Sequence, residues 1–193
     1  MRRRTFDALV SVAGIVLAAV LLAAGGLLLW GHSFVNSQVS AQLSAQKIVF
    51  PARSNPEFKA LPPADAAAMG RYAGQQMTTG AQAKVYADNF IAFHLSKMGG
   101  TYSQLSGKSL AQPTNAKLAA LVDTVFKGTT LRGMLLNAYA FWQMGVIALW
   151  AAIVAFIGAG LMLILSALGF IHSRRVPASA EILSKPTAQN ANA

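Results

Sequence analysis

The sequence predicts an all-α protein in which two transmembrane helices extend into a small extracytoplasmic helical bundle. Two long apolar segments lie near the ends of the 193-residue chain, and the stretch between them shows amphipathic patterns with a helical period. No segment alternates long enough to indicate a sheet. We divide the chain into a cytoplasmic N-terminus, a first span, an extracytoplasmic domain, a second span with an interfacial start and a disordered cytoplasmic tail, at residues 1–7, 8–30, 31–140, 141–172 and 173–193.

The first span, residues 8–30, contains no ionisable side chain. A helix of this length rises far enough, at about 1.5 Å per residue, to cross a hydrocarbon core of about 30 Å. The alternative is a cleaved signal peptide, because Arg2–Arg4 form a suitable basic start. We favour an uncleaved anchor, since the apolar stretch exceeds the usual length of about 7–15 residues and no convincing cleavage site follows it.

The second apolar run extends from Leu135 to Ile171, and we place its membrane part near Gly145–Phe170. Basic residues flank the outermost ends of both spans, at Arg2–Arg4 and at Arg174 and Arg175. Basic residues close to spans favour the cytoplasmic side. We therefore expect a two-span plasma-membrane protein with both termini in the cytoplasm.

The first helix is expected to continue to about Gln46, because apolar residues recur there every four positions. A short extended piece, a loop and four further elements follow. They are the extended residues 47–50, the loop Pro51–Pro63, a helix from Asp65 toward Met77, a helix over 81–98, a helix from Thr101 to Leu110 with a Thr101–Gln104 capping box, and a helix after Pro113 that ends at Gly128. Thr129 or Thr130 would then cap the helix that becomes the second span.

Two sets of side chains are candidate binding surfaces. The helix over 81–98 carries an aromatic face that could bind a partner or ligand, formed by Tyr86, Phe90, Phe93 and His94. For His94 we favour a packed, hydrogen-bonded histidine over a pH-sensitive switch. The second set is a row of small residues that permits close helix packing, within the hairpin or toward a partner, formed by Ala151, Ala155 and Ala159.

Several function classes are disfavoured by the composition. The formal charge is +10, yet the ten basic and four acidic residues of 31–140 are spaced singly, so we expect no nucleic-acid partner. The spans lack the ionisable groups that ion or proton paths need. The chain has no cysteine, no paired metal-ligand motif and no catalytic motif, and Gly107-Lys108-Ser109 lacks the earlier glycine of a phosphate loop. We therefore expect neither an enzyme nor a cofactor.

Four stretches together resemble a group of small, uncharacterised two-span membrane proteins from actinobacteria. They are RRRTFDALVS, RYAGQQMTTGAQAKVYADNFIAFHL, TYSQLSG and VFKGTTLRGMLLNAYAFW, and the likeness covers most of residues 1–172. The resemblance implies the same topology and an actinobacterial plasma membrane. It implies no established activity and no functional residues.

The expected function is therefore that of a non-enzymatic accessory or scaffold protein of the cell envelope. Its partners would be the lipid bilayer and another membrane protein or a second copy of itself, bound through the external helical domain. The alternative is an extracytoplasmic sensor or lipid-binding protein that signals through a separate subunit.

Overall fold

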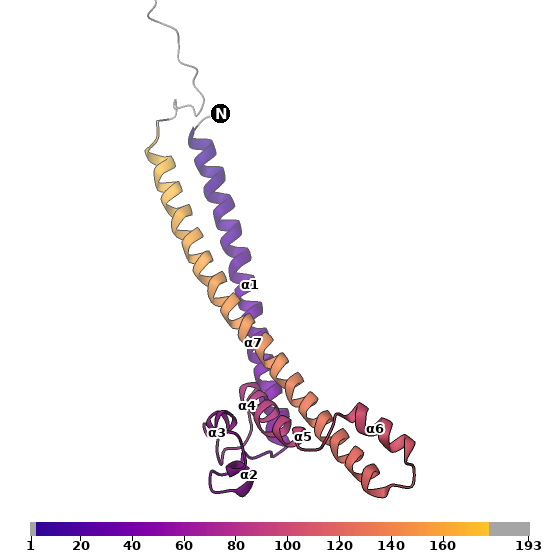
Figure 1. Cartoon of the computed structure of the whole chain (residues 1–193). Helices are drawn as coiled ribbons and strands as arrows, with labels where there is room; N and C mark the ends of the chain where they lie inside the picture. Colours follow the sequence, from indigo (N-terminus) through magenta and orange to yellow (C-terminus); the bar gives the residue numbers. More distant parts are fainter. Residues whose placement is uncertain (1–2, 178–193) are drawn as a thin grey trace, which may run out of the picture. The chain divides into compact units, whose positions relative to one another are not determined.

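The computed structural model describes residues 3–177, and within that range the chain consists of helices, turns and one isolated bridge. The predicted all-α class is confirmed. Two compact units are present, one formed by the chain up to Trp30 together with the chain from Ala148 onward, the other by Gly31–Ile147. Helices α1 (Arg3–Ala45) and α7 (Ala116–Arg175) contribute to both (Figure 1). Most of the predicted disordered tail, residues 178–193, lies outside the described residues.

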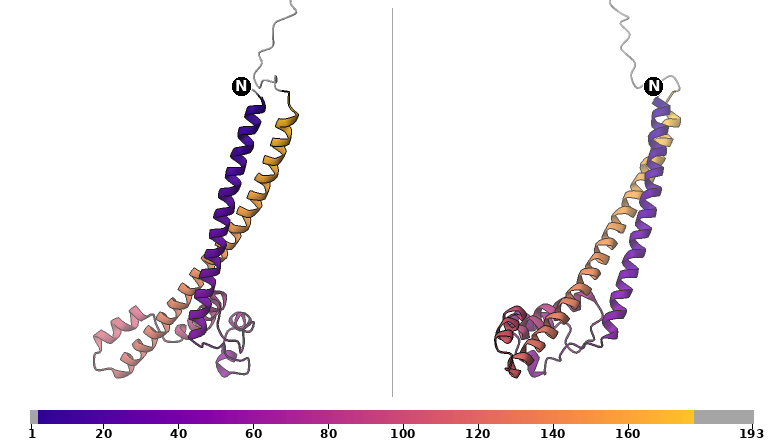
Figure 2. Two further views of the ribbon diagram at one scale, coloured as in Figure 1. Left: turned by 180° about the vertical axis from the view of Figure 1, so that it is seen from behind. Right: turned by 90° about the vertical axis from the view of Figure 1, so that its right-hand side faces the viewer.

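In the first unit, α1 and α7 lie side by side and run in opposite directions (Figures 1 and 2). Their approach is close because small residues meet. A Cβ atom added to Gly14 would collide with the hydroxyl of Ser166, and one added to Gly169 would collide with the hydroxyl of Ser11. The buried side chains of this hairpin are small, at Ser11, Ala18, Ala152, Ala155, Ala159, Ser166 and Ser173. Small residues therefore bring the two backbones together.

The outer surface of this hairpin is apolar. Only 11% of the most apolar window of each helix is buried, and large side chains such as Leu27 and Val154 are 70% and 68% exposed. A core helix of a soluble protein would instead bury most of such a segment. Both helices are long and apolar enough to cross a membrane, which is compatible with a two-span membrane protein.

The second unit has its own hydrophobic core, built on one face of α1 and completed by short elements. Val39 and Leu43 of α1 and Leu135 of α7 are buried there, together with Phe50, Met69 and Met77 of the intervening chain. The short helices that close over this core are α2 (Pro56–Lys59), α3 (Pro63–Met69), α4 (Gly80–Val85), the π-helix η1 (Tyr86–Ile91) and α5 (Ala92–Ser96). The predicted continuation of the first helix past the apolar segment is confirmed, because α1 ends at Ala45.

Two predictions for the chain between α1 and α4 are wrong. The predicted loop Pro51–Pro63 contains α2, whose first turn is capped by the side chain of Asn55 and has Pro56 at its start. The helix predicted from Asp65 toward Met77 ends at Met69. The following backbone pairs with the extended residues 48–50 instead: Phe50 N donates to Gln75 O at 2.9 Å and Met77 N donates to Ile48 O at 2.8 Å. This local pairing satisfies backbone N–H and C=O groups that a longer α3 would have paired within the helix.

The predicted capping box at Thr101 is confirmed and starts helix α6 (Tyr102–Ala111), whose Tyr102 ring packs against Phe126 of α7 with ring centroids 5.5 Å apart. The predicted helix end at Gly128 is wrong, because α7 continues without interruption from Ala116 to Arg175. The side chain of Leu95 lies over Gly128, with its Cδ2 atom 2.8 Å from where a Cβ atom would be. The glycine therefore serves close packing, and its weak helix propensity is overridden.

The helix predicted over 81–98 is present from Gly80 to Ser96, with a π segment in its middle. The Ala92 amide donates to the carbonyl of Ala87, five residues earlier. The same carbonyl accepts a hydrogen bond from Nε of Arg132 on α7, at 3.3 Å. Arg132 thus connects α7 to the π segment. The irregular hydrogen bonding of this segment is accompanied by a donor from another helix, the guanidinium group of Arg132.

Asp88 is the charged centre of this contact. Its Oδ1 atom accepts from Arg132 Nη2 at 2.8 Å, and its Oδ2 atom accepts from Lys84 Nζ at 2.6 Å. Burial of the Asp88 carboxyl raises its pKa, but the hydrogen bonds and charges of Lys84 and Arg132 together outweigh burial, so the pKa lies below its ordinary value. The hydrogen bond to Asp88 and its charge likewise raise the pKa of Lys84.

Replacing Asp88 with Asn is expected to reduce the free energy of unfolding at pH 7 by about 1 kcal/mol, because Arg132 loses its anionic partner. A carboxyl with a lowered folded-state pKa stabilises the protein above its ordinary pKa of 3.8, and that contribution is lost as the pH falls through the lower folded value. Thermal unfolding measured from pH 7 down to pH 2 should therefore show a smaller acid-induced loss in Asp88→Asn.

The matched control is Asp123→Asn, which removes an exposed ion pair with Lys127 on the same long helix that carries Arg132. Its unfolding free energy should change by less than about 0.5 kcal/mol. Equal effects of the two substitutions would contradict the special role of Asp88.

Gly80 allows α4 to approach α7, because a Cβ atom at this position would collide with Cβ of Trp142 and lie 2.6 Å from its Cγ. Neither atom is the free end of a side chain, so the helices must move apart. Gly80→Ala should reduce the free energy of unfolding by about 1–3 kcal/mol. Gly133→Ala is the control, since nothing lies within 4 Å of its added Cβ, and it should leave stability unchanged or raise it. Thermal unfolding followed by circular dichroism compares the two variants.

Candidate functional site

The predicted aromatic face is half-buried against the core of the Gly31–Ile147 unit. Tyr86 packs edge-on against Phe50, with ring centroids 5.3 Å apart, and also against Phe90 at 4.9 Å. The row continues from Phe90 to His94 at 4.4 Å and from His94 to Phe93 at 5.3 Å. Burial raises the pKa of the Tyr86 phenol. The four predicted residues therefore lie together, and part of their surface is used by the fold.

His94 has a partner within its own helix. Its Nδ1 atom lies 2.8 Å from the carbonyl oxygen of Phe90, one turn earlier, so the ring donates a hydrogen bond from this nitrogen. The ring also packs against Phe90 in a tilted arrangement and against Phe93 edge-on. This position is that of a packed histidine whose polar edge is satisfied.

The row of predicted small residues on α7 divides between two faces. Ala155 and Ala159 are buried in the hairpin, whereas Ala151 is exposed and its neighbour Ala152 is buried. The packed row is thus Ala152, Ala155 and Ala159, with spacings of three and four. Helix packing alternates between these spacings, whereas the strict interval of four gradually leaves the contact face.

The Gly31–Ile147 unit contains a groove of about 560 Å³ between the second half of α1 and α7. We call it the amide groove. Apolar side chains make most of its lining, and four amide side chains and no charged ones are among the lining residues. They are Phe34, Val35, Gln38, Val39, Gln42, Leu43, Gln46, Ile48, Leu131, Met134, Leu135, Asn137, Ala138 and Phe141.

The floor and the rim of the amide groove differ in exposure. Val39, Leu43 and Leu135 form the floor and belong to the buried core, whereas Met134 and Phe141 on the rim are 64% and 57% exposed. The rim is therefore not needed to complete the core of its own unit. Large apolar side chains that a unit leaves exposed around a concavity are typical of a binding surface.

The amides of the groove form a regular row. Gln38 and Gln42 on α1 and Gln46, just past the end of α1, follow one another at intervals of four, and Asn137 faces the groove from α7. All four side chains are exposed, and none makes a hydrogen bond to another residue within 3–177. Each amide can both donate and accept, so the row can bond to backbone groups or to other amides.

Sequence reasoning did not identify the amide groove. The repeated glutamines of α1 were a visible signal, but the groove also needs residues 131–141, about ninety positions further along the chain. Nothing in the local pattern shows that these two stretches are neighbours. Within residues 3–177, no three His, Cys, Asp or Glu side chains are placed so that they could hold a metal ion.

Comparison of the chain with protein-family models, with curated proteins and with solved structures gave no match.

Proposed function

We propose that the chain is a membrane-anchored, non-enzymatic accessory protein of the cell envelope that binds a helix of another membrane protein in its amide groove. The observation that carries this proposal is the exposed apolar rim of that groove, which surrounds a row of amides without hydrogen-bond partners among the described residues. Both features are satisfied by one partner that is apolar on one side and offers amide or backbone groups on another.

Membrane anchoring is supported by the hairpin of α1 and α7. Its large apolar side chains point outward, and water would make such exposure unfavourable by roughly 25 cal/mol per Å² of apolar surface. The basic residues Arg4, Arg174 and Arg175 all flank the same end of the hairpin, where α1 starts and α7 stops. By the distribution of positive charge, this end faces the cytoplasm and the Gly31–Ile147 unit lies outside.

A helix is the partner that the groove favours. The α1 side of the lining runs from Phe34 to the end of the helix at Ala45, which corresponds to about 16 Å of helix axis. An amphipathic helix of about a dozen residues matches this length and the apolar-with-amide lining. A phospholipid head group is matched less well, since no basic side chain lines the groove to meet its phosphate.

An extracytoplasmic sensor or lipid-binding protein is the second candidate. The amide groove has about 560 Å³, which lies within the range of about 300–1,000 Å³ for small-molecule pockets. An uncharged apolar ligand such as an acyl chain could occupy it without a basic partner. The two candidates differ in what a probe placed on the rim would capture.

The topology is testable because the chain contains no cysteine, so one introduced cysteine is the only thiol. Ser54 and Pro177 are both exposed, one in the Gly31–Ile147 unit and the other just beyond α7. In intact cells a membrane-impermeant maleimide should label Ser54→Cys and should label Pro177→Cys only after permeabilisation. The reverse pattern would refute the proposed orientation, and labelling of both variants in intact cells would refute the two-span topology.

The partner is testable by a photo-crosslinking amino acid at Met134 on the rim. Ala140 is the matched control, since it is exposed on the same helix but does not line the groove. We expect Met134 to give a discrete crosslink to one membrane protein, and Ala140 to give at least about tenfold less. A crosslink to a second copy of the chain would identify the partner as itself. Crosslinks to lipid alone would favour the sensor, and equal yields at both positions would refute the groove as a binding site.

A further inference from the structure

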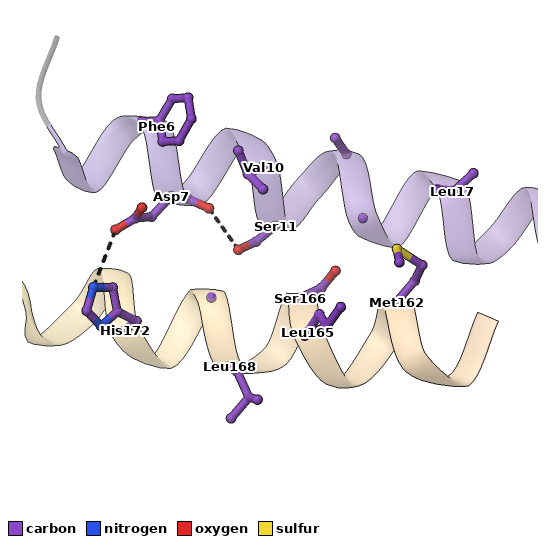
Figure 3. A pocket seen from close by; sticks show the side chains of 13 residues that line it. Phe6, Asp7, Val10, Ser11, Leu17, Met162, Leu165, Ser166, Leu168 and His172 are labelled. Atoms are coloured by element: carbon purple, nitrogen blue, oxygen red, sulfur yellow. Dashed lines mark hydrogen bonds and ion pairs between the residues drawn. The ribbon is translucent and has the colours of Figure 1, made fainter. Parts of the chain in front are cut away.

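The hairpin unit contains a second groove, near the ends of the described chain, with a volume of about 600 Å³. We call it the Asp7 groove. Its floor holds small and polar residues, Ser11 and Gly14 of α1 and Ser166 and Gly169 of α7, while Val10 and Leu165 stand among its apolar walls. Asp7 and His172 close the end nearest the chain termini, as Figure 3 shows. The groove is thus polar at one end and apolar along the rest of its length.

The carboxylate of Asp7 has unfilled acceptor capacity. Its Oδ2 atom is buried and has no hydrogen-bond partner within the described residues. The nitrogen Nε2 of His172 lies 3.9 Å from Oδ2, which is too long for a hydrogen bond. The hydroxyl of Ser11 lies nearby but donates to the backbone oxygen of Asp7 at 2.8 Å (Figure 3). An ionised carboxylate accepts several hydrogen bonds, so Asp7 keeps acceptor capacity that no described residue fills.

The charges around this end have both signs. Asp7 lines the groove and its side chain is 20% exposed, although Oδ2 itself is buried, so a ligand would approach the carboxyl group from the remaining exposed part of the side chain. Arg4 lies three residues before Asp7, and Arg175 lies three residues after His172, so each arginine is a neighbour on its own helix, one turn nearer the terminus. Both arginines are exposed, as is Arg174. The groups whose side chains are described at this end therefore include the Asp7 carboxylate, the His172 imidazole and the guanidinium groups of Arg4, Arg174 and Arg175.

A ligand complementary to this end carries a cationic hydrogen-bond donor beside an anion, with an apolar tail. The donor would bond to Asp7, the anion would lie near Arg4 and Arg175, and the tail would run along Val10, Leu17 and Leu165. A primary ammonium has N–H groups to donate, whereas a quaternary ammonium has none. A purely anionic head group would meet the arginines but would leave the Asp7 carboxylate without a donor.

We propose that the Asp7 groove binds one phospholipid whose head group carries a primary ammonium, a phosphatidylethanolamine, from the leaflet that surrounds the ends of the chain. This inference rests on the proposed membrane anchoring and is independent of the amide groove. The lipid would fill the space between the two helices and donate hydrogen bonds to Asp7. The site distinguishes head groups by the number of N–H donors that they retain.

The test uses the full-length chain in nanodiscs containing equal amounts of two lipids with identical acyl chains, one with an ethanolamine and one with a choline head group. Native mass spectrometry then measures which lipid stays bound. Charge-assisted hydrogen bonds predict a preference for ethanolamine of roughly tenfold. Mono- and dimethylated ethanolamine lipids should give intermediate retention, in the order of their N–H groups.

Three variants test the role of the carboxylate. Asp7→Asn should abolish the preference, Asp7→Glu should retain it, and Asp123→Asn, which removes the same charge outside the hairpin, should leave it unchanged. Circular dichroism checks that each variant is helical. Equal retention of both lipids by the unmodified chain, or a preference that survives in Asp7→Asn, would overturn the proposal. Stronger retention of an added phosphatidylglycerol would show that the arginines alone select the lipid.

Failure of membrane anchoring gives a different result. A chain that is not inserted would remain in solution without detergent and would retain none of these lipids. An inserted chain without head-group preference would contradict only the Asp7 groove.

Discussion

The change in how the two long helices distribute their apolar side chains is the constraint on which the rest of the structure depends. In the hairpin unit, α1 and α7 are apolar around their whole circumference, and the residues that meet between them are small. Beyond Trp30 on α1, and before Ala148 on α7, polar and charged side chains appear, and one face of each helix contributes Val39, Leu43 or Leu135 to a buried core. This apolar face needs a cover, which the short elements between residues 48 and 96 supply. The same backbone geometry thus supports two different kinds of packing along a single helix.

Short-range sequence patterns predicted the elements that depend on residues close together in the chain. The Thr101–Gln104 capping box needs only two side chains three positions apart on the chain, and both of its hydrogen bonds are present. The continuation of α1 past its apolar segment was visible as a repeat of apolar residues. By contrast, the end expected at Gly128 ignored Leu95, which lies over that glycine from another helix. The shorter α3 depends on Phe50 and Gln75, whose backbones pair across twenty-five positions. Such tertiary contacts override helix propensity and cannot be predicted from a short stretch of sequence.

The candidate sites follow the same division. Tyr86, Phe90, Phe93 and His94 were correctly grouped on one face, since helical period alone places them together. Whether that face is free or covered is a tertiary property, and Phe50 covers part of it. Neither groove could be read from one stretch of sequence, because Gln42 and Met134 in one, and Asp7 and His172 in the other, meet only when both long helices are side by side. Asp7 carried a signal nevertheless, as an acidic residue directly before an apolar run.

The π segment has a consequence for how this chain can change in evolution. Between Tyr86 and Ile91 the helix has the π form, in which backbone hydrogen bonds join residues five positions apart. An α-helix between the same flanking residues would need one residue fewer. The elements on either side, α4 and α5, continue in helical form without a break. Residues 86–91 are therefore the place where a homologous protein can lose a single residue. The contacts of Gly80 and Leu95 with α7 would be kept. An alignment gap of one residue would fall here more readily than at any capped end.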